Sequence, residues 1–403
     1  MATVVLVGTL DTKGREYAFL RDQVRERGVD CLLVDAGVFE PQVEPDVPRQ
    51  EVAAAAGADV RELASAGDRG AAVEAMARGA AEVVRRLHAQ GRLDGLAAVG
   101  GSGNSSIAGI AARALPVGVP KLIVSTVASG DTRPYVGASD VTMTYSVVDI
   151  AGINQISARI LANAAGAIAG MATAPLPPLP DAKPLVTASM FGVTTPCVTR
   201  ARERLEELGY EVLVFHQTGT GGQSMEELMR GGYVTASLDV TTTELCDELV
   251  GGVLPAYPGR LEAAGELGLP QVVSLGALDM VNFGPKETVP ERFRGRRLYV
   301  HNPTITLMRT TPDECRELGR RIGRKLSAAK GPTALFVPLR GVSMIATAGQ
   351  PFYDPDADAA LFEGLRETLG PNVEVHELDT DVNDPEFALA MANRLHELVQ
   401  EAR

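Results

Sequence analysis

The sequence predicts an α/β protein made of two Rossmann-like domains, each built on an open parallel sheet, joined by a Pro-rich linker. At 403 residues the chain exceeds one ordinary hydrophobic core. Short β-branched runs alternate with amphipathic segments, which is typical of parallel strands joined by crossover helices. Four prolines within residues 174–183 interrupt this alternation, and it then begins again. We therefore expect a first domain over 1–173, a linker over 174–184 and a second domain over 185–403.

The first domain opens with a strand and a helix that places Tyr17, Leu20 and Val24 on one face. Apolar runs then predict further strands, separated by a Gly- and Ala-rich helix and by a Pro- and acid-rich surface segment. In chain order these elements are strand 4–7, strand 30–34, surface segment 40–48, helix 68–90, strand 96–99 and strand 121–125.

The second domain repeats this alternation beyond the linker. Its predicted elements are strand 185–189, helix 197–208, and strands 211–215, 334–338 and 373–377. A last helix from about Pro385 carries Phe387, Met391, Leu395 and Leu398 on one face. We expect that face to pack either on the second domain or on the first.

Composition excludes several classes of protein. The formal charge of -13 and the absence of Trp argue against nucleic-acid binding, which needs clustered cations and stacking platforms. No apolar window reaches the length that spans a bilayer and no signal peptide precedes the first strand, so a cytoplasmic protein is expected. Four cysteines without CxxC spacing predict buried free thiols rather than disulfides or structural zinc.

Three small-residue loops follow strands of the first domain, where a parallel sheet binds ligands. Small residues let backbone N–H groups approach a phosphate, and the helix that follows adds partial positive charge. No loop matches a strict phosphate fingerprint, so a tight strand-to-helix turn is the alternative for each alone. The candidate nucleotide contacts are Gly8, Thr9, Asp11, Thr12 and Lys13; Gly100, Gly101, Ser102, Gly103, Asn104 and Ser105, before a helix from about Ile107; and Thr126, Ser129, Gly130, Asp131 and Thr132.

Charged residues in these loops suggest how a nucleotide would be held. Asp11 or Asp131 could bind Mg²⁺ directly or through water, while Lys13 and Arg133 neutralise phosphate charge. Asp35 follows the second strand, where a nucleotide fold grips a ribose hydroxyl. The alternative for Asp35 is a turn or helix cap.

Candidate catalytic residues of the second domain also lie at strand ends. His216 and His301 end strand-like runs beside Gly- and Asn-rich turns, where a general base or a metal ligand would be placed. Arg340 follows another strand and suits a substrate carboxylate or phosphate, unless it is a surface residue beside a turn. A metal would need a third ligand, for which the candidates are Asp239, Glu244 and Asp279.

Several long motifs resemble an uncharacterised bacterial and fungal family that includes the amino-terminal domain of the tomato mosaic virus resistance protein. They are VGTLDTKG, GGSGNSS, STVASGDT, FGVTTPCV, GGQSME, PGRLEAAG and HNPTITLMRTT, which together run over essentially the whole chain. The resemblance implies two Rossmann-like subdomains, ATP bound with Mg²⁺ in the first, and a homodimer. By motif, it implies nucleotide contacts in the loops at residues 8–13, 100–105 and 126–132.

These observations leave three hypotheses for the function. The first is an ATP-dependent kinase or ligase that acts on a small carboxylated metabolite between the domains, with His216, His301 and Arg340 orienting and deprotonating it. The second is a non-catalytic ATP-binding module whose nucleotide stabilises a dimer or a partner-binding surface. The third is a metal-dependent hydrolase centred on the two histidines.

Overall fold

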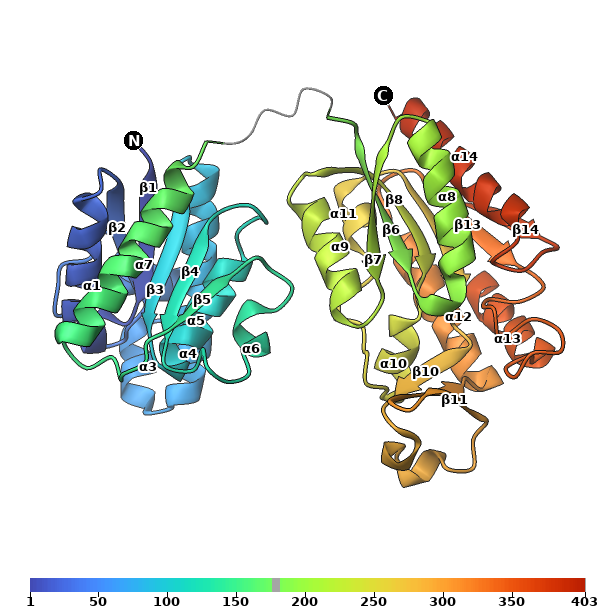
Figure 1. Cartoon of the computed structure of the whole chain (residues 1–403), viewed down its shortest axis with the longest axis horizontal. Coiled ribbons are helices and arrows are strands. Elements are labelled where there is room, and N and C mark those ends of the chain that lie inside the picture. The colour runs from blue at the N-terminus through green and yellow to red at the C-terminus, as the bar shows by residue number, and fades with distance from the viewer. Residues whose placement is uncertain (176–181, 403) are drawn as a thin grey trace. The chain divides into compact units, whose positions relative to one another are not determined.

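A computed structural model describes residues 1–175 and 182–402 of the chain (Figure 1). The chain divides into two compact units, Met1–Pro178 and Leu179–Arg403, named unit 1 and unit 2 below. Most of the Pro-rich segment that predicts the linker, residues 176–181 of 174–184, lies outside the described residues. Both units are Rossmann-like α/β domains, so the predicted fold class is confirmed.

Unit 1 is built on a five-stranded sheet in the order β2-β1-β3-β4-β5, in which every pair of neighbours is parallel. From β1 the chain moves to one side to form β2 and then to the other side to form β3. The direction of winding therefore reverses between β1 and β3, the place where open α/β sheets bind ligands. The strands are β1 (Thr3–Gly8), β2 (Asp30–Asp35), β3 (Gly95–Gly100), β4 (Lys121–Ser125) and β5 (Thr142–Tyr145).

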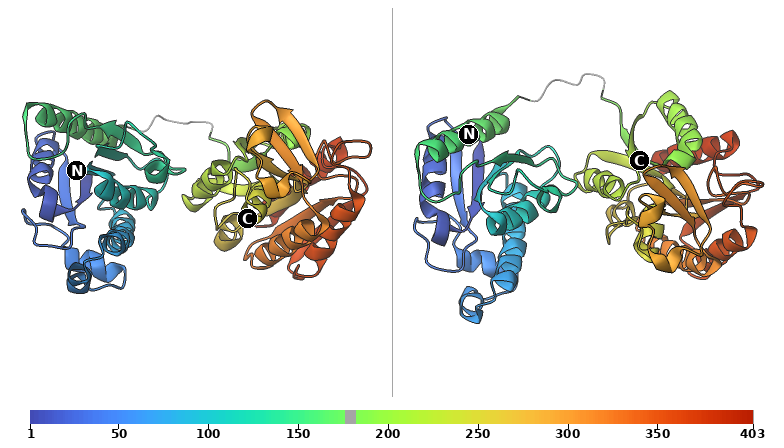
Figure 2. Two further views of the ribbon diagram at one scale, coloured as in Figure 1. Left: turned by 90° about the horizontal axis from the view of Figure 1, so that it is seen from below. Right: turned by 60° about the horizontal axis from the view of Figure 1, so that its bottom comes forward.

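Helices cover both faces of this sheet (Figure 2). Tyr17, Leu20 and Val24 are buried against β1 and α7, as the helical pattern predicts. The opposite face is covered by α2, α4 and α5. The helices of unit 1 are α1 (Leu10–Arg25), α2 (Arg49–Ala55), α3 (Val60–Ala66), α4 (Arg69–Ala89), α5 (Ser102–Arg113), α6 (Arg133–Val136) and α7 (Gln155–Thr173).

Two helices begin earlier than the sequence predicts. The pattern favours a helix beyond Lys13, but α1 begins at Leu10 and has non-helical backbone angles at Lys13. The helix expected from Ile107 begins at Ser102. The first turn of α1 gains a distant partner, since the Asp35 carboxylate accepts a hydrogen bond from the Leu10 amide at 3.2 Å. Local propensity cannot indicate such a contact.

Unit 2 contains a six-stranded parallel sheet in the order β14-β13-β9-β8-β6-β7. Its first strands repeat the order of unit 1, with β6, β7 and β8 in the places of β1, β2 and β3. A small antiparallel sheet, β10-β12-β11, follows β9 in the chain. The strands are β6 (Leu185–Met190), β7 (Glu211–His216), β8 (Val234–Thr241), β9 (Gln271–Gly276), β10 (Met280–Phe283), β11 (Leu298–Asn302), β12 (Ile305–Arg309), β13 (Thr333–Pro338) and β14 (Val373–Leu378).

The last helix, α14, packs on unit 2 itself. Its side chains Phe387, Met391 and Leu395 share a core with Val198 and Leu205 of α8. The helices of unit 2 are α8 (Thr195–Glu207), α9 (Thr220–Arg230), α10 (Glu244–Val250), α11 (Ala263–Leu267), α12 (Pro312–Ser327), α13 (Pro355–Arg366) and α14 (Pro385–Glu401), with short 3₁₀ turns at Gly192–Thr194, Lys286–Thr288 and Glu291–Phe293.

Two predictions from composition can be compared with this fold. All four cysteines are buried free thiols, as expected. Within residues 1–175 and 182–402, no helix has the length and apolar character needed to cross a membrane.

Candidate functional site

A cavity of about 580 Å³ opens in unit 1 at the carboxyl ends of β1, β2 and β3. One end is polar and is formed by the first turns of α1 and α5. The other end is apolar and is formed by α3, α4 and the loop after β2. Its polar wall includes Thr9, Thr12, Lys13, Gly101, Ser102 and Gly103, and its apolar wall includes Val38, Phe39, Leu63, Val73, Met76 and Ile107.

Tyr17 shapes the floor of this cavity. The ladder between β1 and β3 ends at the pair Leu6 and Ala97, beyond which the two strands diverge. The Tyr17 hydroxyl lies in this gap, where it donates to the Val7 carbonyl at 2.6 Å and accepts from the Val99 amide at 2.9 Å. Complete burial raises the pKa of Tyr17 well above its ordinary value. A neutral hydroxyl thus replaces the missing ladder bonds.

Asn104 links the two strand-end loops. Its side-chain amide donates to the Val99 carbonyl at 2.8 Å and to the Tyr17 hydroxyl at 2.9 Å, and its oxygen accepts from the Thr9 amide at 3.2 Å. The residue is only 6% exposed. The sequence predicts Asn104 as a nucleotide contact, whereas the structure uses all three of these bonds to hold the first loop against the second.

The predicted glycines divide into two groups. A Cβ atom on Gly8 would lie 2.0 Å from the Tyr17 hydroxyl, and one on Gly100 would lie 2.5 Å from Asn104 Cβ. These two positions require glycine because other side chains pack against them. A Cβ atom on Gly101 would come no closer than 3.6 Å to Thr126 Oγ1, and one on Gly103 no closer than 3.5 Å to Arg69. The absence of a side chain at Gly101 and Gly103 therefore leaves the cavity wall open.

The carboxylates of Asp11 and Asp35 bind backbone amides. Asp35 is fully buried, and one oxygen accepts from the Leu10 and Gly37 amides at 3.2 and 2.9 Å. Burial raises the pKa of Asp35, and these two bonds oppose the shift. Asp11 accepts from the Val38 and Phe39 amides at 3.2 and 3.0 Å and lines the cavity. One oxygen of Asp35 thus acts as a cap, the alternative that the sequence left open, while its other oxygen has no hydrogen-bond partner.

The third predicted loop does not reach this cavity. Thr126, Ser129, Gly130, Asp131 and Thr132 are absent from the described cavity wall. Asp131 is paired with the exposed Arg133 at 2.9 and 2.7 Å, and this bond lowers the pKa of Asp131 to about 2. Ser105 is buried too, with its hydroxyl 2.6 Å from that of Ser125. The loop follows β4, which lies one strand further from the β1/β3 junction.

The predicted catalytic residues of unit 2 are not assembled. His216 ends β7 and packs its ring on Phe191, with centroids 5.3 Å apart. Arg340 follows β13 and donates to Asp379 at 2.7 Å. Three strands separate β13 from β7, which places these ends roughly 19 Å apart at the usual strand spacing. His301 lies on β11, in the small antiparallel sheet.

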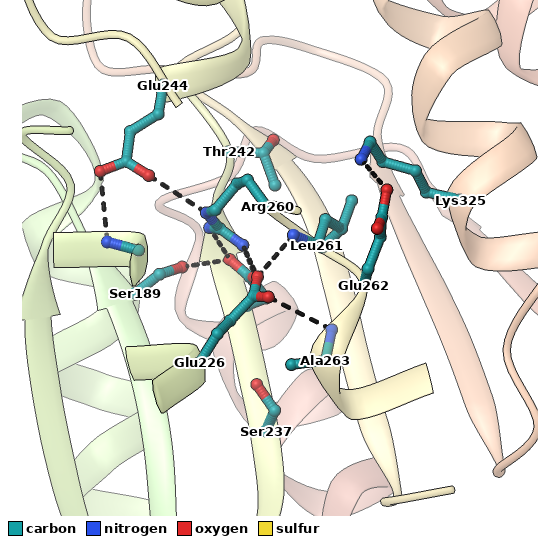
Figure 3. Close-up of polar contacts among 12 residues, drawn as sticks. Ser189, Glu226, Ser237, Thr242, Glu244, Arg260, Leu261, Glu262, Ala263 and Lys325 are labelled. Atoms are coloured by element: carbon teal, nitrogen blue, oxygen red, sulfur yellow. Dashed lines mark hydrogen bonds and ion pairs between the residues drawn. The ribbon is translucent and has the colours of Figure 1, made fainter. Parts of the chain in front are cut away.

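The predicted third metal ligands have other partners, and Figure 3 shows one of them, Glu244, with Arg260. Both oxygens of Asp239 bind the Arg260 guanidinium at 2.5 and 2.7 Å, and Glu244 accepts from Arg260 Nε at 3.1 Å. Asp279 is buried elsewhere and accepts from the Ser343 hydroxyl at 2.8 Å. Among the residues that the structure describes, no three His, Cys, Asp or Glu side chains gather as a metal site.

The Arg260 guanidinium is fully buried and lies between Glu226 and Glu244 in Figure 3. Glu226 contacts it at 3.3 Å and also accepts from the Leu261 and Ala263 amides at 2.5 and 3.2 Å. Neighbouring carboxylates raise the pKa of Arg260, although burial opposes them. One guanidinium therefore holds three carboxylates inside unit 2.

Comparison with known proteins places this chain in a family. The amino-terminal domain of the uncharacterised protein family UPF0261 matches residues 2–177, and its carboxyl-terminal domain matches residues 183–399. The chain belongs to UPF0261. A UPF0261 protein of Clostridium tetani is 53% identical over 98% of this chain and 99% of its own length.

The resemblance read from the motifs is also confirmed. The ToMV resistance protein Tm-1(GCR237) of Solanum lycopersicum is 39% identical over 99% of this chain, which spans 56% of that protein. Among solved structures, the UDP-GlcNAc 2-epimerase of Neisseria meningitidis covers 100% of both chains at 9% identity and a TM-score of 0.25. That score is too low to support any argument about this UPF0261 protein.

Sequence reasoning missed half of the cavity in this UPF0261 protein. Phe39, Leu63, Val73 and Met76 form its apolar wall, but in the sequence they resemble ordinary core or surface residues. Tyr17 gave a weak signal, since a hydroxyl on an otherwise apolar helix face needs a buried partner.

Proposed function

We propose that unit 1 of this UPF0261 protein binds a nucleoside polyphosphate, ATP, in the cavity at the carboxyl ends of β1, β2 and β3. The observation that carries the proposal is the position and lining of that cavity. It lies at the β1/β3 junction of a parallel sheet, its volume is that of a small-molecule site, and it has one polar and one apolar end.

The two ends match the two ends of a nucleotide. Two helices, α1 with 16 residues and α5 with 12, begin at the polar end. In α1 the Leu10, Thr12 and Lys13 amides already bind Asp35 and Thr9, so the first turn of α5 offers the N–H groups that favour phosphate oxygens. Lys13 and Arg69 add positive charge to the same wall. The apolar end offers Phe39, which is 61% exposed, and the partly buried Leu63 and Val73 as surfaces for a purine.

Magnesium fits this site only as a partner of the nucleotide. Asp11 lines the cavity and one of its oxygens has no hydrogen-bond partner, while its other oxygen is used by two amides. A single carboxylate, with phosphate oxygens and water completing the shell, is how Mg²⁺ usually accompanies nucleotides. Asp131 does not suit this role because Arg133 occupies both of its oxygens.

We propose binding as the function and leave turnover to experiment, because the residues predicted to act on an acceptor lie on separated strand ends. A kinase or ligase would convert ATP to ADP or AMP in the presence of its acceptor, whereas a binding module would not. The family resemblance adds a homodimer to the proposal. Sedimentation velocity with and without ATP tests whether the nucleotide stabilises that dimer.

Isothermal titration of the full chain with ATP, with and without Mg²⁺, tests the proposal. Lys13→Ala should weaken ATP binding by about 10- to 100-fold, the usual cost of losing a charged hydrogen bond. Lys286→Ala, an exposed lysine of unit 2, is the matched control and should leave affinity unchanged. Absence of binding at millimolar nucleotide to a folded protein would overturn the proposal.

A further inference from the structure

A second cavity of about 430 Å³ lies beside the first in unit 1. The two share Val38 and Ala64 as a common wall. The second cavity is lined mainly by polar and charged side chains, unlike the apolar end of the first. They are Glu40 from the loop after β2, Arg49 and Gln50 from α2, and Arg61 and Ser65 from α3.

The charges of this second cavity favour an anion. It contains two guanidinium groups and one carboxylate, that of Glu40. Glu40 pairs with Arg49, but its side chain is 88% exposed, so water screens the pair. No described residue forms an ion pair or hydrogen bond with the Arg61 guanidinium. Arg61, without a charge partner among the described residues, thus faces the same space as Arg49, whose partner Glu40 is exposed to water.

Unsatisfied polar atoms gather at the same place. Among the described residues of unit 1, three buried side-chain atoms have no hydrogen-bond partner: Asp11 Oδ1, Asp35 Oδ2 and Arg49 Nε. Arg49 is only 9% exposed, and its positive charge opposes the rise in the pKa of Asp35 that burial causes. All three residues surround the end of β2 and the loop over residues 36–40. Unpaired buried atoms are costly, so each marks a group that a ligand could satisfy. Arg49 Nε is the donor among them, and Arg49 is the one of the three residues that lines the second cavity.

This place is where the ribose of a bound nucleotide would lie. In dinucleotide-binding Rossmann folds this region contacts the ribose, through a carboxylate for a free 2′-hydroxyl or through an arginine for a 2′-phosphate. Here the Asp35 carboxylate is fully buried and one of its oxygens is used by the Leu10 and Gly37 amides. Arginines line the adjoining cavity instead.

We propose that the second cavity binds a phosphomonoester on the ribose, so that the preferred ligand of unit 1 is an adenine nucleotide bearing a 2′- or 3′-phosphate. This inference rests on the proposed nucleotide site. Arg61 and Arg49 donate to the phosphate oxygens, and the planar guanidinium suits such pairing. Glu40 opposes the ligand by its charge and by its pair with Arg49.

Titration of the full chain with 5′-ADP, 2′,5′-ADP and 3′,5′-ADP tests the inference and identifies the phosphate position. One of the two bisphosphates should bind about ten-fold more tightly than 5′-ADP, a ratio equivalent to about 1.4 kcal/mol. Arg61→Gln and Arg49→Gln should bring that ratio toward one. Glu40→Gln should raise it, because this change removes a competing negative charge.

The controls separate this inference from the proposal on which it rests. Arg78→Gln removes an arginine from the exposed pair with Glu74 on α4 and should leave the ratio unchanged. Arg49 is largely buried, so Arg61→Gln and Glu40→Gln carry the test if Arg49→Gln fails to fold. Equal affinity for the three nucleotides, or a preference that survives Arg61→Gln, overturns the inference and leaves nucleotide binding intact. Failure of every nucleotide to bind refutes both.

Discussion

Replacing Tyr17 by Phe tests whether a buried hydroxyl holds β1 and β3 together beneath the cavity. The change keeps the aromatic ring, which is fully buried against the sheet. It removes the oxygen that accepts from the Val99 amide at 2.9 Å and donates to the Val7 carbonyl at 2.6 Å. Any effect therefore reports on hydrogen bonding and not on packing volume.

The expected loss of stability follows from the groups that remain. The Val99 amide is left without this acceptor in a buried position, which costs about 1 to 3 kcal/mol. The Asn104 side chain loses less, because it still donates to the Val99 carbonyl at 2.8 Å. We therefore expect a loss of about 2 kcal/mol. For a unit of this size, that corresponds to a melting temperature lower by about 4 to 8 °C.

Differential scanning calorimetry of the full chain measures this shift, and hydrogen exchange of peptides from β1 and β3 assigns it to unit 1. Tyr145→Phe is the matched control, since that side chain lies in the same unit and is 43% exposed. A Tyr17→Phe protein that melts within about 1 °C of the unchanged chain would refute the reasoning, as it would place the loss below about 0.5 kcal/mol.

Three further outcomes follow from the same contacts. Gly8→Ala should prevent unit 1 from folding, because its Cβ would lie 2.0 Å from Tyr17, and limited proteolysis tests this. Gly101→Ala should fold and lose nucleotide affinity, which titration measures. Asp279→Asn should stabilise unit 2 more at pH 8 than at pH 5. Burial raises the pKa of Asp279 from 3.8 to about 6, so the native state loses stability as pH rises through that window. The side chain of the Asp279→Asn variant does not titrate and causes no such loss. Equal gains at both pH values in urea melts would contradict this. Arg260→Met should cost unit 2 at least about 3 kcal/mol in the same urea melts, because it leaves three carboxylates buried without their cation.

Many strands of the two parallel sheets could be predicted because their signal is local, whereas β5, β8 and β9 were missed. The run at residues 121–125 has an apolar centre, Leu122 to Val124, and coincides with β4. Helix starts were predicted less well, since Leu10 and Ser102 stand among small polar residues that usually form loops. What makes these residues helical is tertiary contact, such as that from Asp35.

The candidate site could be predicted only where its residues differ chemically from a core. Polar residues that follow strand ends, such as Thr9 and Ser102, indicated one wall of the cavity. The apolar wall gave no signal, because Leu63 and Met76 have the spacing that any packed helix shows. The order of the strands in the sheet could not be predicted either, and that order places His216 and Arg340 on strands that are not neighbours.

The two units share the order of their first strands, so the residues at the two matching junctions can be compared directly. In unit 2 the direction of winding reverses between β6 and β8, the counterpart of the β1/β3 junction. There the Ser189 hydroxyl donates to Asp239 at 2.6 Å, and Asp239 binds the buried Arg260.

This junction in unit 2 is thus filled by the chain's own cation and its three carboxylates. Phosphates approaching it would meet negative charge instead of free amides, since Glu244 already binds the Gly219 and Gly222 amides at the start of α9. Nucleotide binding should therefore be confined to unit 1. Titration should give about one nucleotide per chain, and a value near two would show that the Arg260 cluster opens to admit a ligand.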